Sequence, residues 1–189
     1  IDIIEKQVRH MTYLLDDVLL IGKSEAGKIK VNLTTIELRA FMQNLADEVQ
    51  QMASDSHTVN VRWNCQFNSY TSDEKLLRNI VLNLLSNAVK FSPEADRVDL
   101  SISNTSRHVI IKVRDFGIGI PAEDVGKLFQ PFTRGGNVTS IQGTGLGLSI
   151  VKKAVELLGW QVELTSNIGD GTEFTIILPG SYPGNTPQN

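Results

Sequence analysis

Three polar side chains recur at helical spacing in an otherwise apolar segment. Asn83, Asn87 and Lys90 follow one another at steps of four and three residues, so a helix places them on one face. An asparagine oxygen suits Mg²⁺ that is shared with substrate phosphates, and a lysine can meet a phosphate as a point charge. The spacing predicts a metal and phosphate site. The alternative is that these residues form the solvent-facing side of an amphipathic helix.

A carboxylate and two glycines follow a predicted strand further along the chain. Asp115 begins this segment, and Gly117 and Gly119 let the backbone approach a ligand closely. The carboxylate can accept a hydrogen bond from an exocyclic amine, which would select adenine over guanine. The alternative is a tight turn from a strand into a helix, with Pro121 at the first helical position.

A second glycine-rich segment opens a predicted helix. It consists of Gly143, Thr144, Gly145, Leu146 and Gly147. The free N–H groups and the dipole at a helix start favour an anion, although a flexible hinge is the alternative. The glycines follow the spacing G-x-G-x-G and not the G-x-G-x-x-G of dinucleotide-binding proteins, and a loop precedes them instead of a strand. A Rossmann fold is therefore excluded. Together with the two preceding motifs, this segment predicts a nucleotide site with a divalent metal.

Composition narrows the class of protein. The chain has 189 residues, 41% of them apolar, which is enough for one compact domain with a core. Its net charge of -3 gives no sign of a nucleic-acid partner. No apolar run reaches the roughly 18 residues that span a membrane, so we expect no membrane contact by this chain. The single Cys65 is expected to be a buried thiol in a reducing, cytoplasmic compartment.

The beginning of the chain carries a heptad pattern. Apolar residues recur there at steps of four and three: Ile4, Val8, Met11, Leu15 and Val18. This pattern predicts a long amphipathic helix over residues 1–27, as an arm of a bundle or, alternatively, as a core helix of the same domain. Because Ile1 lies inside the pattern and is not Met, we expect the intact protein to be longer, with room for a membrane anchor elsewhere.

The rest of the chain alternates helices with pairs of strands. We predict strand Lys30–Glu37, helix Leu38–Ala53, strand Thr58–Cys65, helix Glu74–Phe91, strands Arg97–Ser103 and Val109–Arg114, helix Leu146–Leu158, and strands Gln161–Ser166 and Thr172–Leu178. Asp73 is a good N-cap, and residues 115–145 have the low periodicity of a long functional loop. The fold class is α+β, a two-layer α/β sandwich with one mixed sheet covered by helices on one face.

In their order and spacing, these motifs resemble the nucleotide-binding boxes of sensor histidine kinases. The helix with Asn83 and Asn87 resembles the N box, residues 115–119 the G1 box, 129–132 the F box and 143–147 the G2 box. The resemblance implies the Bergerat ATP-binding fold of histidine kinases, type II topoisomerases, mismatch-repair ATPases and heat-shock chaperones. It also implies ATP and Mg²⁺ as cofactors and transfer of the γ-phosphoryl group to a histidine.

The resemblance implies roles for single residues. Asn87 would hold Mg²⁺ with the help of Asn83, and Lys90 would touch phosphate. Independently of the resemblance, Arg134 could reach a γ-phosphate, so the expected catalytic residues are Asn83, Lys90 and Arg134. The residues expected to contact nucleotide are Asn83, Asn87, Lys90, Phe91, Asp115, Gly117, Gly119, Ile120, Phe132, Gly143, Thr144, Gly145, Leu146, Gly147 and Thr172. Asp115 would bind the adenine amine and Thr172 would line the adenine side. Phe129 and Phe132 are expected to anchor the long loop.

The resemblance also divides the chain. Residues 1–27 resemble the second helix of the dimerisation and phosphoacceptor domain, 28–179 form the ATP-binding catalytic domain, and 180–189 are expected to be a disordered tail. The first helix of that domain, with the acceptor histidine, is not in this sequence. We therefore expect the acceptor on an upstream segment, a homodimer in the intact protein, and the receiver domain of a response regulator as partner.

Three other functions stay open. A hydrolysing ATPase of the same fold resembles this chain but places Glu where Asn83 stands, and an amide is a poor base for water. A protein serine kinase of the anti-sigma type looks similar in its nucleotide boxes but would not need the helix over residues 1–27. A module that binds nucleotide without transferring phosphate would act through partner docking.

Overall fold

The computed structural model describes residues 19, 22, 29–53, 57–133 and 144–180. The chain divides into two compact units, Ile1–Val31 and Asn32–Asn189. Leu19 and Gly22 of the first unit are helical, and the remainder of the helix predicted over residues 1–27 lies outside the described residues, as does nearly all of the predicted tail. In the part of the chain that is described, no helix has the length and apolar character needed to cross a bilayer.

Helices and strands of the second unit follow the predicted order. They are β1 (Thr34–Glu37), α2 (Leu38–Ala53), β2 (Thr58–Asn64), β3 (Ser69–Ser72), α3 (Glu74–Lys90), β4 (Arg97–Asn104), β5 (His108–Asp115), α4 (Ala122–Val125), α5 (Gly147–Leu158), β6 (Gln161–Asn167) and β7 (Gly171–Pro179). Every element predicted after residue 37 is confirmed to within one residue at each end.

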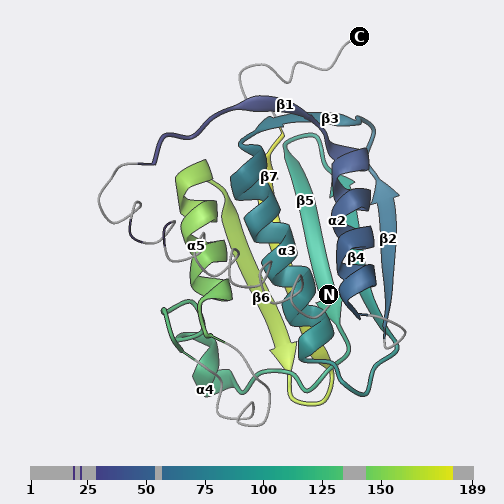
Figure 1. The fold of residues 1–189 in the computed structure, drawn as a ribbon, viewed down its shortest axis with the longest axis vertical. Coiled ribbons are helices and arrows are strands. Elements are labelled where there is room, and N and C mark those ends of the chain that lie inside the picture. The colour runs from purple at the N-terminus through teal and green to yellow at the C-terminus, as the bar shows by residue number, and fades with distance from the viewer. Residues whose placement is uncertain (1–18, 20–21, 23–28, 54–56, 134–143, 181–189) are drawn as a thin grey trace, which may run out of the picture. The chain divides into compact units, whose positions relative to one another are not determined.

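Five strands form one mixed sheet in the order β2-β4-β5-β7-β6. β2 runs parallel to β4, and the other neighbours are antiparallel. Helices α2, α3 and α5 lie side by side over one face of this sheet (Figure 1). Alternate residues of β4, namely Val98, Leu100 and Ile102, are fully buried on that face. The predicted two-layer α/β sandwich is therefore confirmed.

Helix α3 lies in the middle of the helix layer and carries the predicted polar stripe. Asp73 caps its start, because Asp73 Oδ1 accepts hydrogen bonds from the N–H groups of Lys75 (3.0 Å) and Leu76 (3.1 Å). Its other face is apolar, with Leu77 and Ile80 completely buried. The helix runs toward the end of the sheet at which β5 stops, so its last turns reach the glycine-rich segment (Figure 1).

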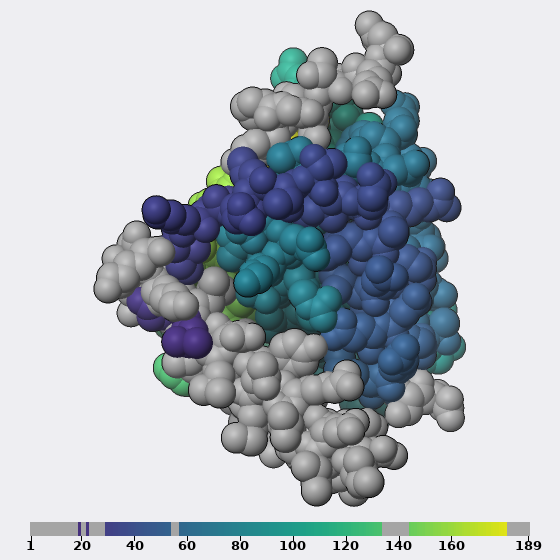
Figure 2. All heavy atoms as spheres, turned by 45° about the horizontal axis from the view of Figure 1, so that its top comes forward, coloured from purple at the N-terminus to yellow at the C-terminus, as the bar shows by residue number. Residues whose placement is uncertain are grey.

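Three features differ from the prediction. β1 has four residues instead of the predicted eight, and it pairs antiparallel with β3, which was not predicted. These two strands make a separate sheet, so the prediction of a single sheet is wrong. The segment Ser69–Ser72 lacks the apolar alternation that reveals a strand. β1 lies across the ends of α2 and α3 (Figures 1 and 2). The short helix α4 lies in the segment predicted to be a loop.

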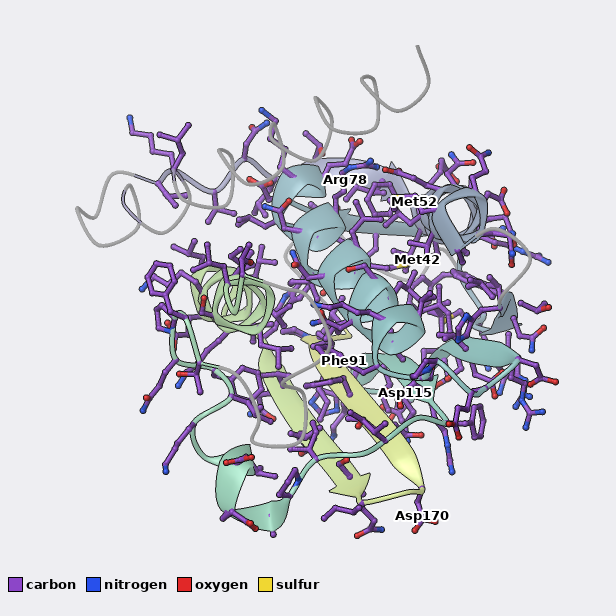
Figure 3. All side chains as sticks on the ribbon, turned by 60° about the horizontal axis from the view of Figure 1, so that its bottom comes forward. Met42, Met52, Arg78, Phe91, Asp115 and Asp170 are labelled. Atoms are coloured by element: carbon purple, nitrogen blue, oxygen red, sulfur yellow. The ribbon has the colours of Figure 1, made fainter. Side chains whose placement is uncertain are left out.

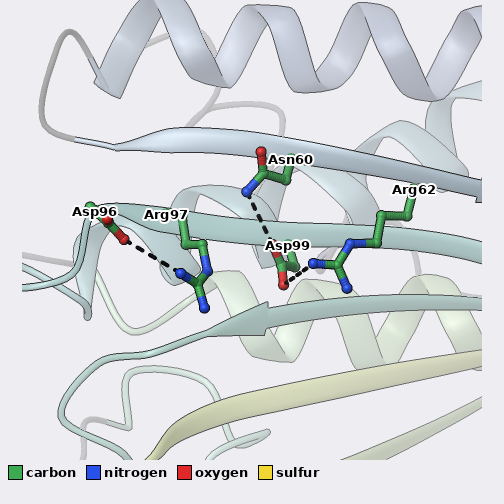
Figure 4. A network of polar contacts seen from close by, with 5 residues as sticks. All are labelled: Asn60, Arg62, Asp96, Arg97 and Asp99. Atoms are coloured by element: carbon green, nitrogen blue, oxygen red, sulfur yellow. Dashed lines mark hydrogen bonds and ion pairs between the residues drawn. The ribbon is translucent and has the colours of Figure 1, made fainter.

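The second face of the mixed sheet is polar. Arg62 lies 3.4 Å from Asp99, and the Asn60 amide donates to the same carboxylate at 3.3 Å (Figure 4). Lys112 and Glu173 form an ion pair of 2.7 Å across β5 and β7. Such a face suits a sheet that a single layer of helices covers on its other side.

Cys65 follows β2 and is half-buried, so the prediction of a buried thiol is only partly right. Burial raises the pKa of the Cys65 thiol to about 11. A thiol with so high a pKa carries almost no thiolate at neutral pH, and Cys65 is therefore a poor nucleophile.

Candidate nucleotide-binding site

Segments that are far apart in sequence meet where β5 ends. They are the last turns of α3, the glycine-rich segment after β5, the β6–β7 hairpin and the first turn of α5. Figure 3 labels Phe91 and Asp115 at this end of the molecule and Asp170 on the hairpin. The Phe91 carbonyl accepts a hydrogen bond from the Ile118 N–H at 3.1 Å, which joins α3 to the glycine-rich segment. The described residues of the predicted motifs therefore surround one site.

Asp115 provides a buried carboxylate in this site. The residue is 5% exposed, and its Oδ1 accepts hydrogen bonds from the N–H groups of Gly117 (3.0 Å) and Thr172 (3.1 Å). Burial raises the pKa of the carboxyl to about 6, although both N–H donors and the neighbouring Arg114 lower it. Oδ2 receives no hydrogen bond from the described residues. This second oxygen is therefore available to accept a hydrogen bond from a ligand.

The two glycines after Asp115 are required by close backbone contacts. A Cβ on Gly117 would collide with the backbone of Phe91, and a Cβ on Gly119 would collide with the carbonyl of Asn167. Gly119 also has a φ of 67°, which favours glycine. The segment is thus held between the end of α3 and the β6–β7 hairpin, and it keeps Asp115 and its neighbours in a fixed position.

The β6–β7 hairpin adds hydroxyl groups next to Asp115. Thr172 is buried, and its hydroxyl lies 3.0 Å from that of Ser166. Ser166 Oγ also accepts from the Ile120 N–H at 2.9 Å and donates to the Gly171 carbonyl at 2.9 Å. Thr172 and Ile120 are predicted site residues, whereas Ser166 was not predicted. The only signal for it is its inward position in the alternating pattern of β6.

The asparagine pair of α3 faces the first turn of α5. The Asn83 amide donates to the Asn79 carbonyl at 2.8 Å, which leaves Asn83 Oδ1 as its remaining acceptor. A Cβ on Gly147 would lie 2.7 Å from Asn83 Oδ1 and 3.6 Å from Asn87 Nδ2. Glycine at position 147 therefore lets the start of α5 approach both asparagines. This contact brings the first and third predicted motifs together.

The donor atoms of this pair fit the predicted metal. The oxygens of Asn83 and Asn87 are neutral, hard ligands of the kind that Mg²⁺ accepts together with phosphate oxygens and water. Both residues are only partly buried, so the remaining ligand positions can come from a substrate. Within the described residues no cluster of three His, Cys, Asp or Glu side chains forms another candidate metal site. On the next turn, the Lys90 ammonium lies 4.8 Å from the centroid of the Phe91 ring.

The long loop between α4 and α5 is described at both ends. The Phe129 ring packs edge-to-face on Phe174 at 6.5 Å, which confirms it as an anchor. Phe132 is not such an anchor, because its side chain is 75% exposed. Its backbone N–H instead donates to the Gly145 carbonyl at 3.0 Å. The Thr144 hydroxyl accepts from the Leu146 N–H at 3.4 Å. Two predicted site residues, Arg134 and Gly143, lie outside the described residues.

The Phe116 ring contacts two arginines next to the site, on the polar face of the mixed sheet. Phe116 lies under the guanidinium carbons of Arg97 and Arg114, at 4.4 and 5.1 Å from its centroid. Figure 4 shows Arg97 on this face beside Asp96 and Asp99. Asp115 is held by hydrogen bonds from Gly117 and Thr172, and Phe116 is held by its contacts with the two arginines. Both residues therefore help to fix the end of β5. No sequence motif predicted this cluster.

A buried histidine supports the turn that carries Phe91. His57 is 5% exposed, and its Nε2 lies 2.7 Å from the Ser92 carbonyl oxygen and 3.1 Å from the Ser92 hydroxyl. A carbonyl can only accept, so Nε2 carries the hydrogen of that bond. His57 thus ties the start of β2 to the backbone on which Gly117 rests. No sequence motif marks this contact.

Comparisons with known proteins agree with this geometry. The family described as "Histidine kinase-, DNA gyrase B-, and HSP90-like ATPase" matches residues 72–181, more than half of the chain. The circadian input-output histidine kinase CikA of Synechococcus elongatus is 34% identical over 177 residues, which are 90% of this chain and 23% of CikA. The sensor histidine kinase WalK of Bacillus subtilis is 32% identical over 180 residues, 93% of this chain and 29% of WalK. The chain therefore spans about a quarter of the length of these relatives.

Solved structures show the same fold. Full-length ShkA, crystallised in complex with AMPPNP, matches with a TM-score of 0.74 and 28% identity over 90% of this chain and 36% of ShkA. The Acinetobacter baumannii histidine kinase AdeS matches with a TM-score of 0.74 over 94% of this chain and 82% of AdeS, and at 22% identity this likeness concerns the fold alone. The predicted Bergerat fold is confirmed. The chain belongs to the family of histidine kinase-, DNA gyrase B- and HSP90-like ATPases, and the relatives it resembles within that family are sensor histidine kinases.

Proposed function

We propose that the chain is the ATP-binding catalytic portion of a sensor histidine kinase. It transfers the γ-phosphoryl group of ATP to a histidine on an upstream segment, from which the aspartate of a response regulator receives it. The observation that carries this proposal is the Asp115 carboxylate, which is buried in a glycine-lined site with one oxygen fixed by two N–H groups and the other open. Membership of the family and the AMPPNP bound to the related ShkA support it.

Asp115 and Thr172 recognise the adenine base. The open Oδ2 of Asp115 accepts a hydrogen bond from the exocyclic amine, and above a pH of about 6 this bond is charge-assisted. Gly117 and Gly119 keep the backbone close enough to contact the base, because they carry no side chain between the base and the chain. Phe91 and Ile120 border the same space from the end of α3 and from the glycine-rich segment.

The first turn of α5 and the polar stripe of α3 bind the phosphates. Among the described residues no side chain caps the start of α5, so its first N–H groups can attract the negative charge, and Lys90 adds a cation on α3. Asn87, assisted by Asn83, would hold Mg²⁺, and the ion would supply positive charge to offset the negative charge of the phosphates. The residues of the chain thus position the γ-phosphorus for in-line attack by an imidazole nitrogen, and the bond to the bridging oxygen breaks as ADP leaves.

Transfer to a protein suits this site better than hydrolysis. A hydrolysing relative would need a carboxylate base at position 83, where this chain has an amide whose nitrogen is engaged with the Asn79 carbonyl. We also propose a homodimer for the intact protein, a receiver domain as partner, and a cytoplasmic location for this portion, as in two-component signalling.

Labelling with γ-³²P-ATP and Mg²⁺ tests the proposed function. This chain is compared with a longer chain that includes the native upstream residues, and the chemical stability of the label is measured. Label that is acid-labile and base-stable, and present only on the longer chain, is the expected result. Acid-stable label would instead identify a serine or threonine kinase. ATP binding without any label would leave a nucleotide-dependent docking module and contradict the kinase proposal.

A further inference from the structure

Three polar side chains form a row across the sheet at the nucleotide-binding end. Asp115 lies on β5, Thr172 on the neighbouring strand β7, and Ser166 opposite Thr172 on β6. The Thr172 N–H donates to Asp115 Oδ1 at 3.1 Å, and the Thr172 hydroxyl lies 3.0 Å from the Ser166 hydroxyl. The proposed function uses Asp115 and Thr172 but leaves Ser166 without a role.

The partners of Ser166 determine which hydroxyl donates. A hydroxyl group has one hydrogen, and the Gly171 carbonyl oxygen, 2.9 Å from Ser166 Oγ, can only accept. The Ser166 hydrogen therefore goes to Gly171, and the Ile120 N–H donates to Ser166 at 2.9 Å. Thr172 must then be the donor in its contact with Ser166. In the reverse arrangement, Ser166 Oγ and the Gly171 oxygen would be two acceptors facing each other with no hydrogen between them.

This arrangement sets the chemical character of the base site. With its hydrogen committed to Ser166, the Thr172 hydroxyl offers only lone pairs to any other group. Ionised Asp115 also offers only lone pairs, and the Thr172 N–H that could have donated is bonded to Asp115 Oδ1. Two adjacent acceptor side chains favour a base edge that presents a hydrogen-bond donor and disfavour one that does not.

We propose that Ser166 is a positioning residue that holds the Thr172 hydroxyl as an acceptor and thereby makes the site selective for a purine with an exocyclic amine. This inference rests on the proposed function and deepens it. Ser166 touches no part of the nucleotide itself. It acts through Thr172, so its effect is on the choice of base and not on phosphate transfer.

The test compares ATP with purine riboside 5′-triphosphate, which is ATP without the amine. Equilibrium binding of both nucleotides to the 189-residue chain gives the ratio of their affinities. The wild-type chain is expected to prefer ATP by at least about tenfold. Ser166→Ala frees the Thr172 hydroxyl to rotate, so the ratio should fall by about three- to tenfold, the range of one hydrogen bond. Thr172→Val should lower it by the same factor, and the double variant no further.

The affinity ratio separates the positioning role from a structural one. Ser166→Ala also leaves the Ile120 N–H without its acceptor, and the resulting loosening would weaken both nucleotides equally and leave the ratio unchanged. Ser166→Thr keeps the hydroxyl and is expected to retain the wild-type ratio. Ser166→Cys is close to serine in size but is a weak donor and acceptor, so it provides the same test if Ser166→Ala does not fold.

Three outcomes would overturn the inference. An unchanged ratio in both Ser166→Ala and Ser166→Cys would show that Ser166 does not set the Thr172 hydroxyl. A further fall of the ratio when Ser166→Ala is added to Thr172→Val would show that Ser166 acts by another route. A wild-type chain that binds neither nucleotide would contradict the proposed function itself, and with it this inference, whereas the first two outcomes leave ATP binding intact.

Discussion

The substitution Asp115→Asn is expected to weaken ATP binding and to stabilise the protein at the same time. An asparagine can keep its Oδ1 on the N–H groups of Gly117 and Thr172, which lie at 3.0 and 3.1 Å. Its NH₂ group then replaces Oδ2 and meets the adenine amine donor with another donor. Loss of one charge-assisted hydrogen bond corresponds to about 1.5–3 kcal/mol. The Kd for ATP should rise by about 10- to 150-fold.

The gain in stability comes from removing a buried charge. The pKa of Asp115 rises from 3.8 to about 6 on folding, so the folded protein holds this proton more strongly than the unfolded chain. The stability that protonation of Asp115 contributes is therefore fully present below about pH 4, and it is lost as the pH rises through about 6. Above that pH the carboxylate costs about 3 kcal/mol relative to its neutral form. Asp115→Asn should recover up to this amount at pH 8 but only about half of it at pH 5, which lies between the two pKa values.

Two measurements on the same pair of proteins check these expectations. Calorimetric titration with ATP gives the affinity, and urea unfolding at pH 8 and pH 5 gives the stability. Unchanged ATP affinity would refute the role of Asp115 in base binding. A variant that is less stable than the wild type at pH 8 would refute the reasoning about the buried charge. Misfolding of the variant cannot imitate the expected result, because affinity and stability change in opposite directions.

Three further substitutions test other parts of the site. Asn87→Ala should abolish the dependence of ATP affinity on Mg²⁺ in titrations with and without the metal, and a retained dependence contradicts the metal role. Gly147→Ala places a Cβ 2.7 Å from Asn83 Oδ1 and should displace this oxygen, so ATP affinity should fall by about tenfold. Wild-type affinity of this variant would disprove the close packing. Phe132→Gly should raise stability against urea by about 0.5–1 kcal/mol, because strain at a φ of 62° exceeds the entropy that glycine adds to the unfolded chain. Lower stability would show that the exposed Phe132 ring makes a stabilising contact.

Local patterns made most of the fold predictable. A helix has a period of 3.6 residues and a strand a period of two, so the apolar spacing around Ile80 and around Leu100 determines both the type of element and its buried face. Asp73 was recognisable as an N-cap because an oxygen at that position satisfies N–H groups of its own helix. β3 was missed because its pairing with β1 is a long-range contact between short, largely polar strands.

The sequence allowed prediction of the site residues that lie in motifs, but not of the residues that contact them. Asn83, Asn87 and Asp115 were recognisable because each sits in a pattern whose chemistry is unusual for a core. The partners that hold those residues lie elsewhere in sequence and carry no pattern of their own. Ser166 resembles any inward polar residue of a strand, and His57 resembles any residue at a strand start, until the fold brings them to Thr172 and Ser92. Tertiary contacts of this kind cannot be inferred from periodicity.

In the proposed complex, the base and the phosphates of ATP are held by different kinds of structure. Asp115 and Thr172 belong to strands in the middle of a sheet, each paired on both sides, so the groups proposed to bind the base are fixed before any ligand binds. Part of the proposed phosphate site instead lies at the first turn of α5, where Gly145, with a φ of 72°, precedes the helix. Base selectivity should therefore be retained when the phosphates are removed. Adenosine should bind more weakly than ATP and still lose affinity in Asp115→Asn by the factor found for ATP.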